Sequence, residues 1–277
     1  MDLHSVEAVV VPTSREDVWP LGAHDAVLAG GTWLFSEPQV DIQRLVDITR
    51  LGWPSVVVTD SGVELAATCT IDRVSQLSEE LPRQHPEWAA APLLRHCCDA
   101  LLASFKIWRT ATVGGNVCLS LPAGAMISLL SALDGILTVW RPDGSDYQIA
   151  ITDFVTGSAT NVLSPGELLR AASVPAHALR AMTAFRQLAP SALGRSGIVV
   201  IGRRDTEQDG GGFTLSITAA TVRPYVFRFD TVPGVGDLRS VHAGIPDDAW
   251  TRDAHGDPDW RRGVSLTLAE QICGELR

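Results

Sequence analysis

The sequence lacks the residue groupings that hold metal ions in proteins. Its five cysteines are scattered, and no two of them stand in CxxC spacing: Cys69, Cys97, Cys98, Cys118 and Cys273. An iron–sulfur cluster needs four grouped thiolates, so the chain does not build one alone. An odd, scattered set is typical of reduced, buried cysteines. The seven histidines show no HExxH motif or other zinc spacing, and we predict no metal site.

Motifs of covalent and acid–base catalysis are also missing. The chain contains no GxSxG pentapeptide, and its serines, histidines and aspartates form no defensible triad pattern. We therefore predict no catalytic side chain. This absence fits a protein in which a bound cofactor carries the chemistry and the chain positions it.

Long apolar runs, excess positive charge and a secretion signal are absent as well. No run approaches the roughly 20 apolar residues of a membrane span, so we expect no such span. The net charge of −10 argues against a nucleic-acid partner, because phosphates need a basic face. The segment MDLHSVEAVVVPTS lacks the basic start and long apolar core of a signal peptide, and we expect a cytoplasmic protein.

The sequence does contain enough apolar residues for a folded protein of several lobes. It has 277 residues, of which 45% are hydrophobic and 19% charged. An N-terminal α/β lobe is expected over 1–55, with strands at 6–11, at 26–29 and before Ile48, and a short helix capped by Ser14. A second α/β lobe is expected over 56–175. It contains predicted hairpins at 56–66 and 136–151 and predicted helices at 70–77, 88–103 and 122–133.

The third part, residues 176–277, is predicted to be a small antiparallel sheet with helices. Its expected strands lie at 183–188, 197–203, 213–219 and 225–229, with a polar, glycine-rich hairpin tip at 205–212 and a loop-rich stretch at 234–256. Asp257 and Pro258 begin a C-terminal helix as cap and first-turn residue. One apolar stripe on this helix packs on the sheet or on a partner: Trp260, Val264, Leu268, Ile272 and Leu276.

Two glycine pairs stand where short apolar runs end. The stretch 111–133, ATVGGNVCLSLPAGAMISLLSAL, carries Gly114 and Gly115 before an apolar helix, and 27–34, VLAGGTWL, carries Gly30 and Gly31. Glycine lets backbone N–H groups approach a ligand closely, and consecutive N–H groups form an anion nest. The helix N-terminus adds free N–H groups. Two such turns can grip one diphosphate from two sides, although a single glycine pair is also typical of a tight turn before a buried helix.

A set of motifs resembles the FAD-binding subunit of molybdenum hydroxylases, the family of xanthine dehydrogenase and carbon monoxide dehydrogenase. AGGTWL at 29–34 resembles its AGGTxL loop, and ATVGGN…PAGAMISLLSAL resembles its TVGGN…SPAADL…ALLAL segment. The further motifs are VPTS at 11–14, LVDI at 45–48, LSPGELL at 163–169 and AFR at 184–186. The resemblance covers nearly the whole chain. It implies an α+β protein with the PCMH-type FAD-binding fold of two α/β lobes, followed by a C-terminal domain of the CO dehydrogenase flavoprotein type.

The resemblance also implies which residues contact FAD. Because the chain is acidic, the diphosphate must be held by backbone N–H groups and helix dipoles, and the hydroxyls of Thr32 and Thr112 and the Asn116 amide are suitable donors. The implied contacts are Val27, Leu28, Ala29, Gly30, Gly31, Thr32, Trp33, Leu34, Leu102, Ala111, Thr112, Gly114, Gly115, Asn116, Cys118, Gly124, Ala125, Leu169 and Arg186.

Three of these positions have alternative interpretations. Arg186 is implied to lie beside the flavin ring, where a cation stabilises negative charge on the reduced ring, or it is a surface ion-pair partner. Trp33 replaces a position that is often polar, and its indole either lies on a ring of FAD or fills a gap in the core. Ala125 stands where the family has an acidic residue that resembles a ligand of the ribose hydroxyl. Without that carboxylate, the binding of the adenosine end of FAD is in doubt.

The resemblance implies an electron-transfer subunit that binds FAD non-covalently. Its expected partners are an iron–sulfur subunit and a molybdenum-cofactor subunit, and its electron acceptor is expected to be NAD or oxygen. On this hypothesis the chain does not oxidise the organic substrate alone. Two alternatives remain open at this point: a stand-alone flavin-dependent oxidoreductase, and a related scaffold that has lost FAD.

Overall fold

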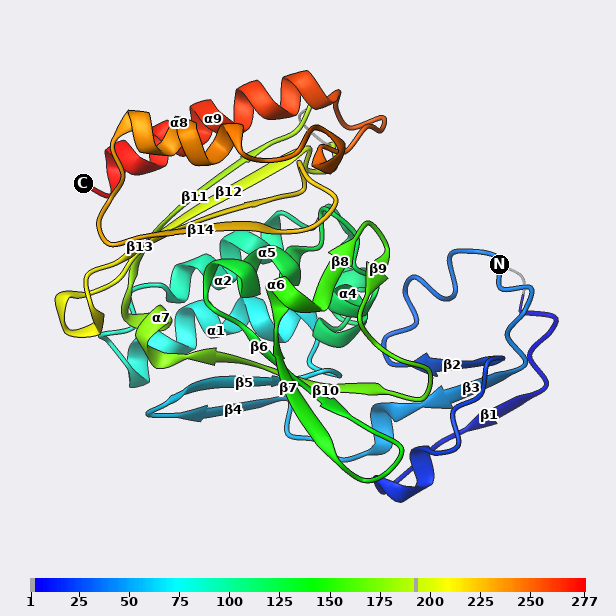
Figure 1. Cartoon of the computed structure of the whole chain (residues 1–277). Helices are drawn as coiled ribbons and strands as arrows, with labels where there is room; N and C mark the ends of the chain where they lie inside the picture. The colour runs from blue at the N-terminus through cyan, green and yellow to red at the C-terminus, as the bar shows by residue number, and fades with distance from the viewer. Residues whose placement is uncertain (1–2, 192–193) are drawn as a thin grey trace.

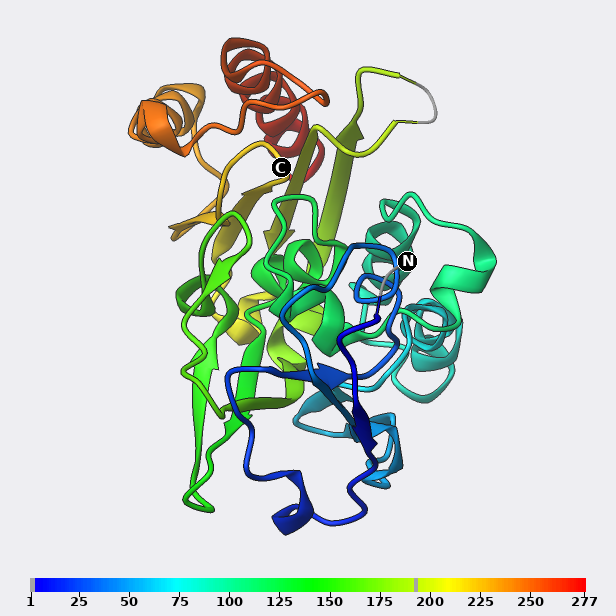
Figure 2. The same cartoon turned by 90° about the vertical axis from the view of Figure 1, so that its right-hand side faces the viewer.

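The chain folds into three main sheets separated by helices, in a computed structural model that describes residues 3–191 and 194–277. Figure 1 shows the arrangement in layers: helices α8 (Val235–Ala243) and α9 (Pro258–Glu275) cover a four-stranded sheet, a helical layer lies beneath it, and a five-stranded sheet follows. A small parallel sheet lies to one side. Figure 2 shows this N-terminal lobe at the end of the molecule opposite α8 and α9.

The N-terminal lobe is a parallel sheet of three short strands in the order β1-β3-β2. The strands and the two 3-10 turns of this lobe are β1 (Ala8–Val10), η1 (Glu16–Val18), β2 (Asp25–Leu28), β3 (Arg44–Asp47) and η2 (Ile48–Arg50). The helix predicted after Ser14 is only the turn η1, and the carboxylate of Asp17 accepts a hydrogen bond from the Ser14 N–H at 3.1 Å. An ion pair between Arg44 and Asp25 joins β3 to β2.

The second sheet is antiparallel and has the order β4-β5-β10-β6-β7. Its strands are β4 (Val56–Thr59), β5 (Gly62–Ala66), β6 (Ile136–Trp140), β7 (Asp146–Ala150) and β10 (Leu168–Pro175). Both predicted hairpins are therefore present. The central strand β10 was not predicted, because its LLRAASVP run shows no alternation of apolar and polar residues.

Seven helices lie between Ile71 and Arg180, and several of them differ in length from the predicted helices. They are α1 (Ile71–Gln84), α2 (Ala91–Asp99), α3 (Phe105–Trp108), α4 (Val113–Cys118), α5 (Ala125–Ala132), α6 (Ile151–Phe154) and α7 (Ala176–Arg180), and a two-stranded ribbon of β8 (Val155–Gly157) and β9 (Thr160–Asn161) lies beside them. The helix α1 is longer than predicted because Pro82 is tolerated in it. The helix α5 begins three residues later than predicted, because Gly124 is its N-cap.

The third sheet is an antiparallel meander of β11 (Met182–Leu188), β12 (Ile198–Arg204), β13 (Phe213–Thr218) and β14 (Tyr225–Phe229). The short turn η3 (Glu207–Asp209) lies in the connection from β12 to β13, within the predicted hairpin tip. The turn η4 (Asp247–Ala249) lies after the sheet, before the C-terminal helix. The C-terminal helix α9 (Pro258–Glu275) starts as predicted, since the Asp257 carboxylate accepts from the Asp259 N–H at 2.9 Å. Its stripe packs on its own sheet, where Ile272 and Leu276 are buried.

The helix α8 (Val235–Ala243) lies in the stretch predicted to be loop-rich. The sequence did not predict this helix, because Leu238 and His242 are its only buried residues and they form no apolar stripe. The core of the second sheet includes Val199 and Ile201 of β12, so the second and third sheets share packing. The division into domains at residues 55 and 175 remains a prediction.

A buried arginine joins the third sheet to the helical layer. Arg203 of β12 is 2% exposed, pairs with Asp134 at 2.7 Å and donates to the Ala132 carbonyl at 3.1 Å. Burial alone would raise the pKa of Asp134, but hydrogen bonds and charge from Arg228 and Arg203 lower it to about 2. The ionised carboxylate therefore holds the end of α5 against the sheet.

None of the helices in the described parts of the chain combines the length and apolar composition that crossing a membrane requires.

A buried histidine predicts a loss of stability as the pH falls. His242 of α8 is 3% exposed, its Nε2 lies 2.9 Å from the Ser265 hydroxyl of α9, and burial lowers its pKa. Because the unfolded chain binds this proton more readily, the stability is present above about pH 6.5 and is lost as the pH falls toward the folded-state pKa.

The test is the free energy of unfolding of the wild type and of His242→Gln, measured by denaturant titration between pH 7.5 and pH 5. We expect the wild type to lose stability more steeply than the variant as the pH falls, by at most about 1.4 kcal/mol per pH unit, because the two proteins differ in one titrating group. His24→Gln, at an exposed position, is the control and should follow the wild type. Equal slopes for the wild type and His242→Gln would contradict the assignment.

Candidate cofactor site

The two glycine pairs lie in segments that are in direct backbone contact. A Cβ at Gly30 would overlap the carbonyl oxygen of Thr110 and lie 2.7 Å from its carbonyl carbon and 3.2 Å from the Ala111 Cα. Such distances leave no room for a side chain, so only glycine fits. The structure thus brings the segments 29–34 and 111–116 together, as the two-sided grip requires.

The first glycine segment leaves its backbone donors free. Within the described residues, the N–H groups of positions 30–34 donate no hydrogen bond to the protein. Gly31 has φ +67°, and the turn closes behind it, where the Phe35 N–H donates to the Gly31 carbonyl at 2.8 Å. Consecutive free N–H groups in a tight turn are what an anion nest requires, and the nest at this segment remains a prediction.

The second glycine segment uses its backbone donors internally. The Val113 N–H donates to Cys69 O and the Gly114 N–H to Ala67 O, both at 2.8 Å, and the Gly115 N–H donates to the Thr112 hydroxyl at 3.1 Å. The prediction of a second backbone nest is therefore wrong, because Thr112 caps the short helix α4 and the start of this helix docks on the chain after β5. Hydrogen bonds from the segment 113–116 to a ligand must therefore come from side chains.

Asn116 is the side chain of this segment that keeps free donors. Its Oδ1 accepts a hydrogen bond from the Met126 N–H at 2.8 Å, near the N-terminus of α5. This bond fixes the orientation of the amide, and no described residue accepts from its Nδ2 group. Asn116 therefore caps one helix with its oxygen and offers two N–H donors with its nitrogen.

The start of α5 offers no polar side chain to a ligand. Gly124 is buried, and a Cβ there would lie 2.7 Å from the Ile127 side chain. Ala125 is 2% exposed. Contacts of Gly124 and Ala125 with FAD remain predictions, and only main-chain atoms are available for them.

The other predicted contacts divide into exposed and buried residues. Val27 and Leu102 are 39% and 56% exposed, whereas Leu169 is buried in β10. Burial raises the pKa of the Cys118 thiol to about 12, so it stays protonated at neutral pH. The backbone of Ala111 lies beside Gly30. The contacts of these residues with FAD remain predictions.

Arg186 of β11 is held by residues outside the glycine segments. Its guanidinium pairs with Glu275 of α9 and donates to the Phe185 carbonyl at 2.9 Å. This is the surface ion pair named as the alternative for this residue. A role beside the flavin ring remains a prediction.

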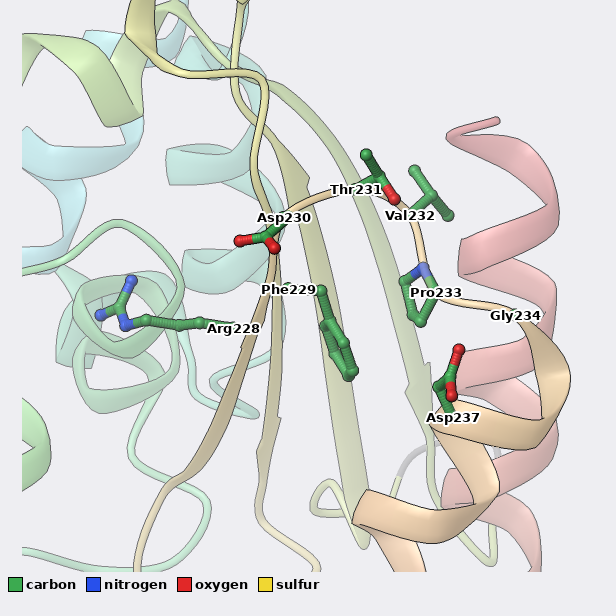
Figure 3. Close-up of a pocket in the computed structure, with 8 residues that line it drawn as sticks. All are labelled: Arg228, Phe229, Asp230, Thr231, Val232, Pro233, Gly234 and Asp237. Atoms are coloured by element: carbon green, nitrogen blue, oxygen red, sulfur yellow. The ribbon is translucent and has the colours of Figure 1, made fainter.

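A separate cavity of about 400 Å³ lies on the connection from β14 to α8. Figure 3 shows Asp230 and Asp237 at this cavity, with Arg228 extending away from them. Arg228 instead pairs with Asp134 at 2.6 Å. No residue predicted to contact FAD lines this cavity, and its carboxylates do not suit an anionic ligand.

Comparison with protein families identifies the class of this site. A model described as "FAD binding domain in molybdopterin dehydrogenase" matches residues 6–177, more than half of the chain. The chain belongs to this family, and FAD is the cofactor of its members. No match was found among curated proteins.

Solved structures show the same fold over almost the whole chain. Reconstituted CO dehydrogenase from Oligotropha carboxidovorans is 19% identical, with 98% of this chain and 97% of that chain covered and a TM-score of 0.81. Quinoline 2-oxidoreductase from Pseudomonas putida 86 is 16% identical, with coverage of 97% and 96% and a TM-score of 0.75. Carbon monoxide dehydrogenase from Hydrogenophaga pseudoflava is 16% identical, with coverage of 98% and 97% and a TM-score of 0.77. The predicted fold, the PCMH-type FAD-binding fold with a C-terminal sheet and helices, is confirmed.

The residues present fit the cofactor. Free N–H groups at 30–34 suit a doubly negative diphosphate, and the Asn116 amide offers further donors. This set holds an anion without lysine or arginine, which suits a chain with a net charge of −10.

Proposed function

We propose that this chain is the FAD-carrying electron-transfer subunit of a molybdenum hydroxylase-type complex. The observation that supports it most is the turn at 30–34, which has free N–H groups and whose Gly30 packs on the backbone of Thr110 and Ala111. When bound, FAD supplies the electron-transfer chemistry. The chain's own residues bind the diphosphate and hold the cofactor in one orientation.

Partner subunits follow from what the chain does not contain. Among the described residues, no three histidine, cysteine, aspartate or glutamate side chains are placed to hold a metal ion. A structure of Cu,Mo-CO dehydrogenase shares this fold, with a TM-score of 0.80, and its molybdenum supports a molybdenum-cofactor subunit as partner. We propose that electrons arrive from an iron–sulfur subunit and leave to NAD or oxygen, and that the complex is cytoplasmic.

Co-expression with the expected partners, an iron–sulfur subunit and a molybdenum-cofactor subunit, tests this function. We expect a complex to co-purify, to contain FAD, and to pass electrons to NAD or oxygen only when this chain is present. The chain alone should not oxidise an organic substrate. Turnover by the single chain would instead support a stand-alone flavin oxidoreductase, the alternative that the buried, uncharged Ala125 favours.

Asn116→Asp separates binding from folding at this site. The carboxylate keeps an acceptor for the Met126 N–H, so the cap on α5 is preserved, and an acid near a helix N-terminus is favourable. It removes both N–H donors and places a negative charge near the diphosphate. We expect FAD affinity to fall at least about tenfold, since hydrogen bonds to charged groups are worth roughly 1.5–3 kcal/mol.

FAD titration and thermal melting of the FAD-free chain measure the two effects of this substitution. The melting midpoint should stay within about 2 °C of the wild type, because the cap is kept. Unchanged FAD affinity in Asn116→Asp would remove Asn116 from the site.

A further inference from the structure

Trp33 has an exposed indole without a protein partner. Its exposed fraction is 43%, whereas the other seven tryptophans are buried or half-buried. Within the described residues, its ring contacts no other aromatic ring or cation, and its Nε1 donates no hydrogen bond. By contrast, Trp19 donates to the Gly166 carbonyl at 2.7 Å, and the rings of Trp53 and Trp140 lie 5.2 Å apart.

The backbone of Trp33 is nevertheless fixed. Its carbonyl accepts hydrogen bonds from the N–H and the hydroxyl of Ser36, both at 2.9 Å, and from the Glu37 N–H at 3.3 Å. The indole is therefore attached to an ordered turn and still presents its face to solvent.

Trp33 belongs to the segment 30–34 that is predicted to form the anion nest. Its own N–H is one of the free donors, and its Cα is two residues from that of Gly31. Two residues span at most roughly 7 Å, so the Cα of Trp33 lies within that distance of Gly31 and its ring can reach a cofactor held at the nest. In FAD a ribose separates the diphosphate from adenine and a ribityl chain separates it from isoalloxazine, so either ring is within reach of a side chain near the diphosphate.

We propose that Trp33 stacks on one of the two planar rings of FAD, adenine or isoalloxazine, while the nest beside it holds the diphosphate. This inference rests on the proposed function, because it requires FAD at this site. Offset stacking of flat rings is favourable beyond the burial of apolar area, and indole offers the largest aromatic face among the side chains. Trp33 is then the residue that selects a dinucleotide with a ring over a bare diphosphate.

Two substitutions of similar size test stacking against simple apolar contact. Trp33→Phe keeps an aromatic face, and Trp33→Leu keeps apolar bulk without one. We expect FAD affinity to fall less than about threefold in Trp33→Phe and roughly tenfold or more in Trp33→Leu. Because the indole is exposed, the melting midpoints of both variants should equal that of the wild type when FAD is absent. FAD should quench tryptophan fluorescence in the wild type and quench it less in Trp33→Phe.

Separate titrations with FMN and ADP identify the ring. A Trp33→Leu defect with FMN but not ADP supports stacking on isoalloxazine, and the reverse supports stacking on adenine. A wild type that binds FAD, with Trp33→Leu binding it equally well, overturns the stacking inference and leaves the proposed function standing. A wild type that binds no FAD overturns both.

Discussion

Gly30→Ala is expected to abolish FAD binding. A Cβ at this position would overlap the Thr110 carbonyl oxygen, which belongs to the backbone and cannot turn aside. The turn at 30–34 must then move away from the segment that carries Asn116, and a displacement of about 1 Å is enough to separate the donors from one diphosphate. We expect FAD affinity to fall at least about 100-fold, with a loss of roughly 1–3 kcal/mol in stability from the overlap.

FAD titration and thermal melting measure both effects of Gly30→Ala. The matched control is Gly263→Ala in α9, where a Cβ meets no atom within 4 Å. That variant should bind FAD normally and gain up to about 1 kcal/mol in stability, because alanine favours helix over glycine. Normal FAD affinity in Gly30→Ala would show that contact between the two segments is not needed.

Arg261→Met is expected to destabilise the C-terminal part of the protein more than the substitution of an exposed residue does. Arg261 of α9 is 1% exposed, and its Nη1 donates to the carbonyls of Gly197 and, at 2.7 Å, Ala219. Its guanidinium also pairs with Asp253. Removing it leaves the two carbonyls without their donor, and each buried polar group left unsatisfied costs about 1–3 kcal/mol. The melting midpoint should fall by roughly 10 °C.

The neighbouring residue supplies the control for this measurement. Arg262 is 40% exposed and pairs with Asp247, which is 92% exposed. Ion pairs in solvent are worth about 0–1 kcal/mol, so Arg262→Met should move the midpoint by no more than about 3 °C. Equal losses in the two variants would contradict a special role for Arg261 in attaching α9 to the sheet.

Segments with strong local signals were predicted closely from the sequence. The strand at Ile136–Trp140 and the start of α9 at Pro258 agree with the structure, because one is a short apolar run before a turn and the other has an Asp cap followed by proline. The apolar stripe of α9 also correctly indicated packing on its own sheet. In each case the residues that specify the element lie within it.

Features that depend on distant residues were not predictable in this way. The sequence shows a glycine pair at 114 and 115, but only the fold shows that Gly114 donates to Ala67 and that the Thr112 hydroxyl caps α4. The same glycine signal therefore predicted one segment whose N–H groups are free, at 30–34, and one whose N–H groups are used within the protein, at 113–116. The contact of Gly30 with Thr110, about 80 residues later, has no local signal at all.

The visible absorption spectrum of the purified chain, recorded after FAD addition and desalting, tests the central claim most directly. The account predicts an oxidised-flavin spectrum that survives desalting in the wild type and is lost in Gly30→Ala, with Gly263→Ala retaining it. A wild-type spectrum without flavin, both for the chain alone and for the chain co-expressed with its partner subunits, would contradict the account.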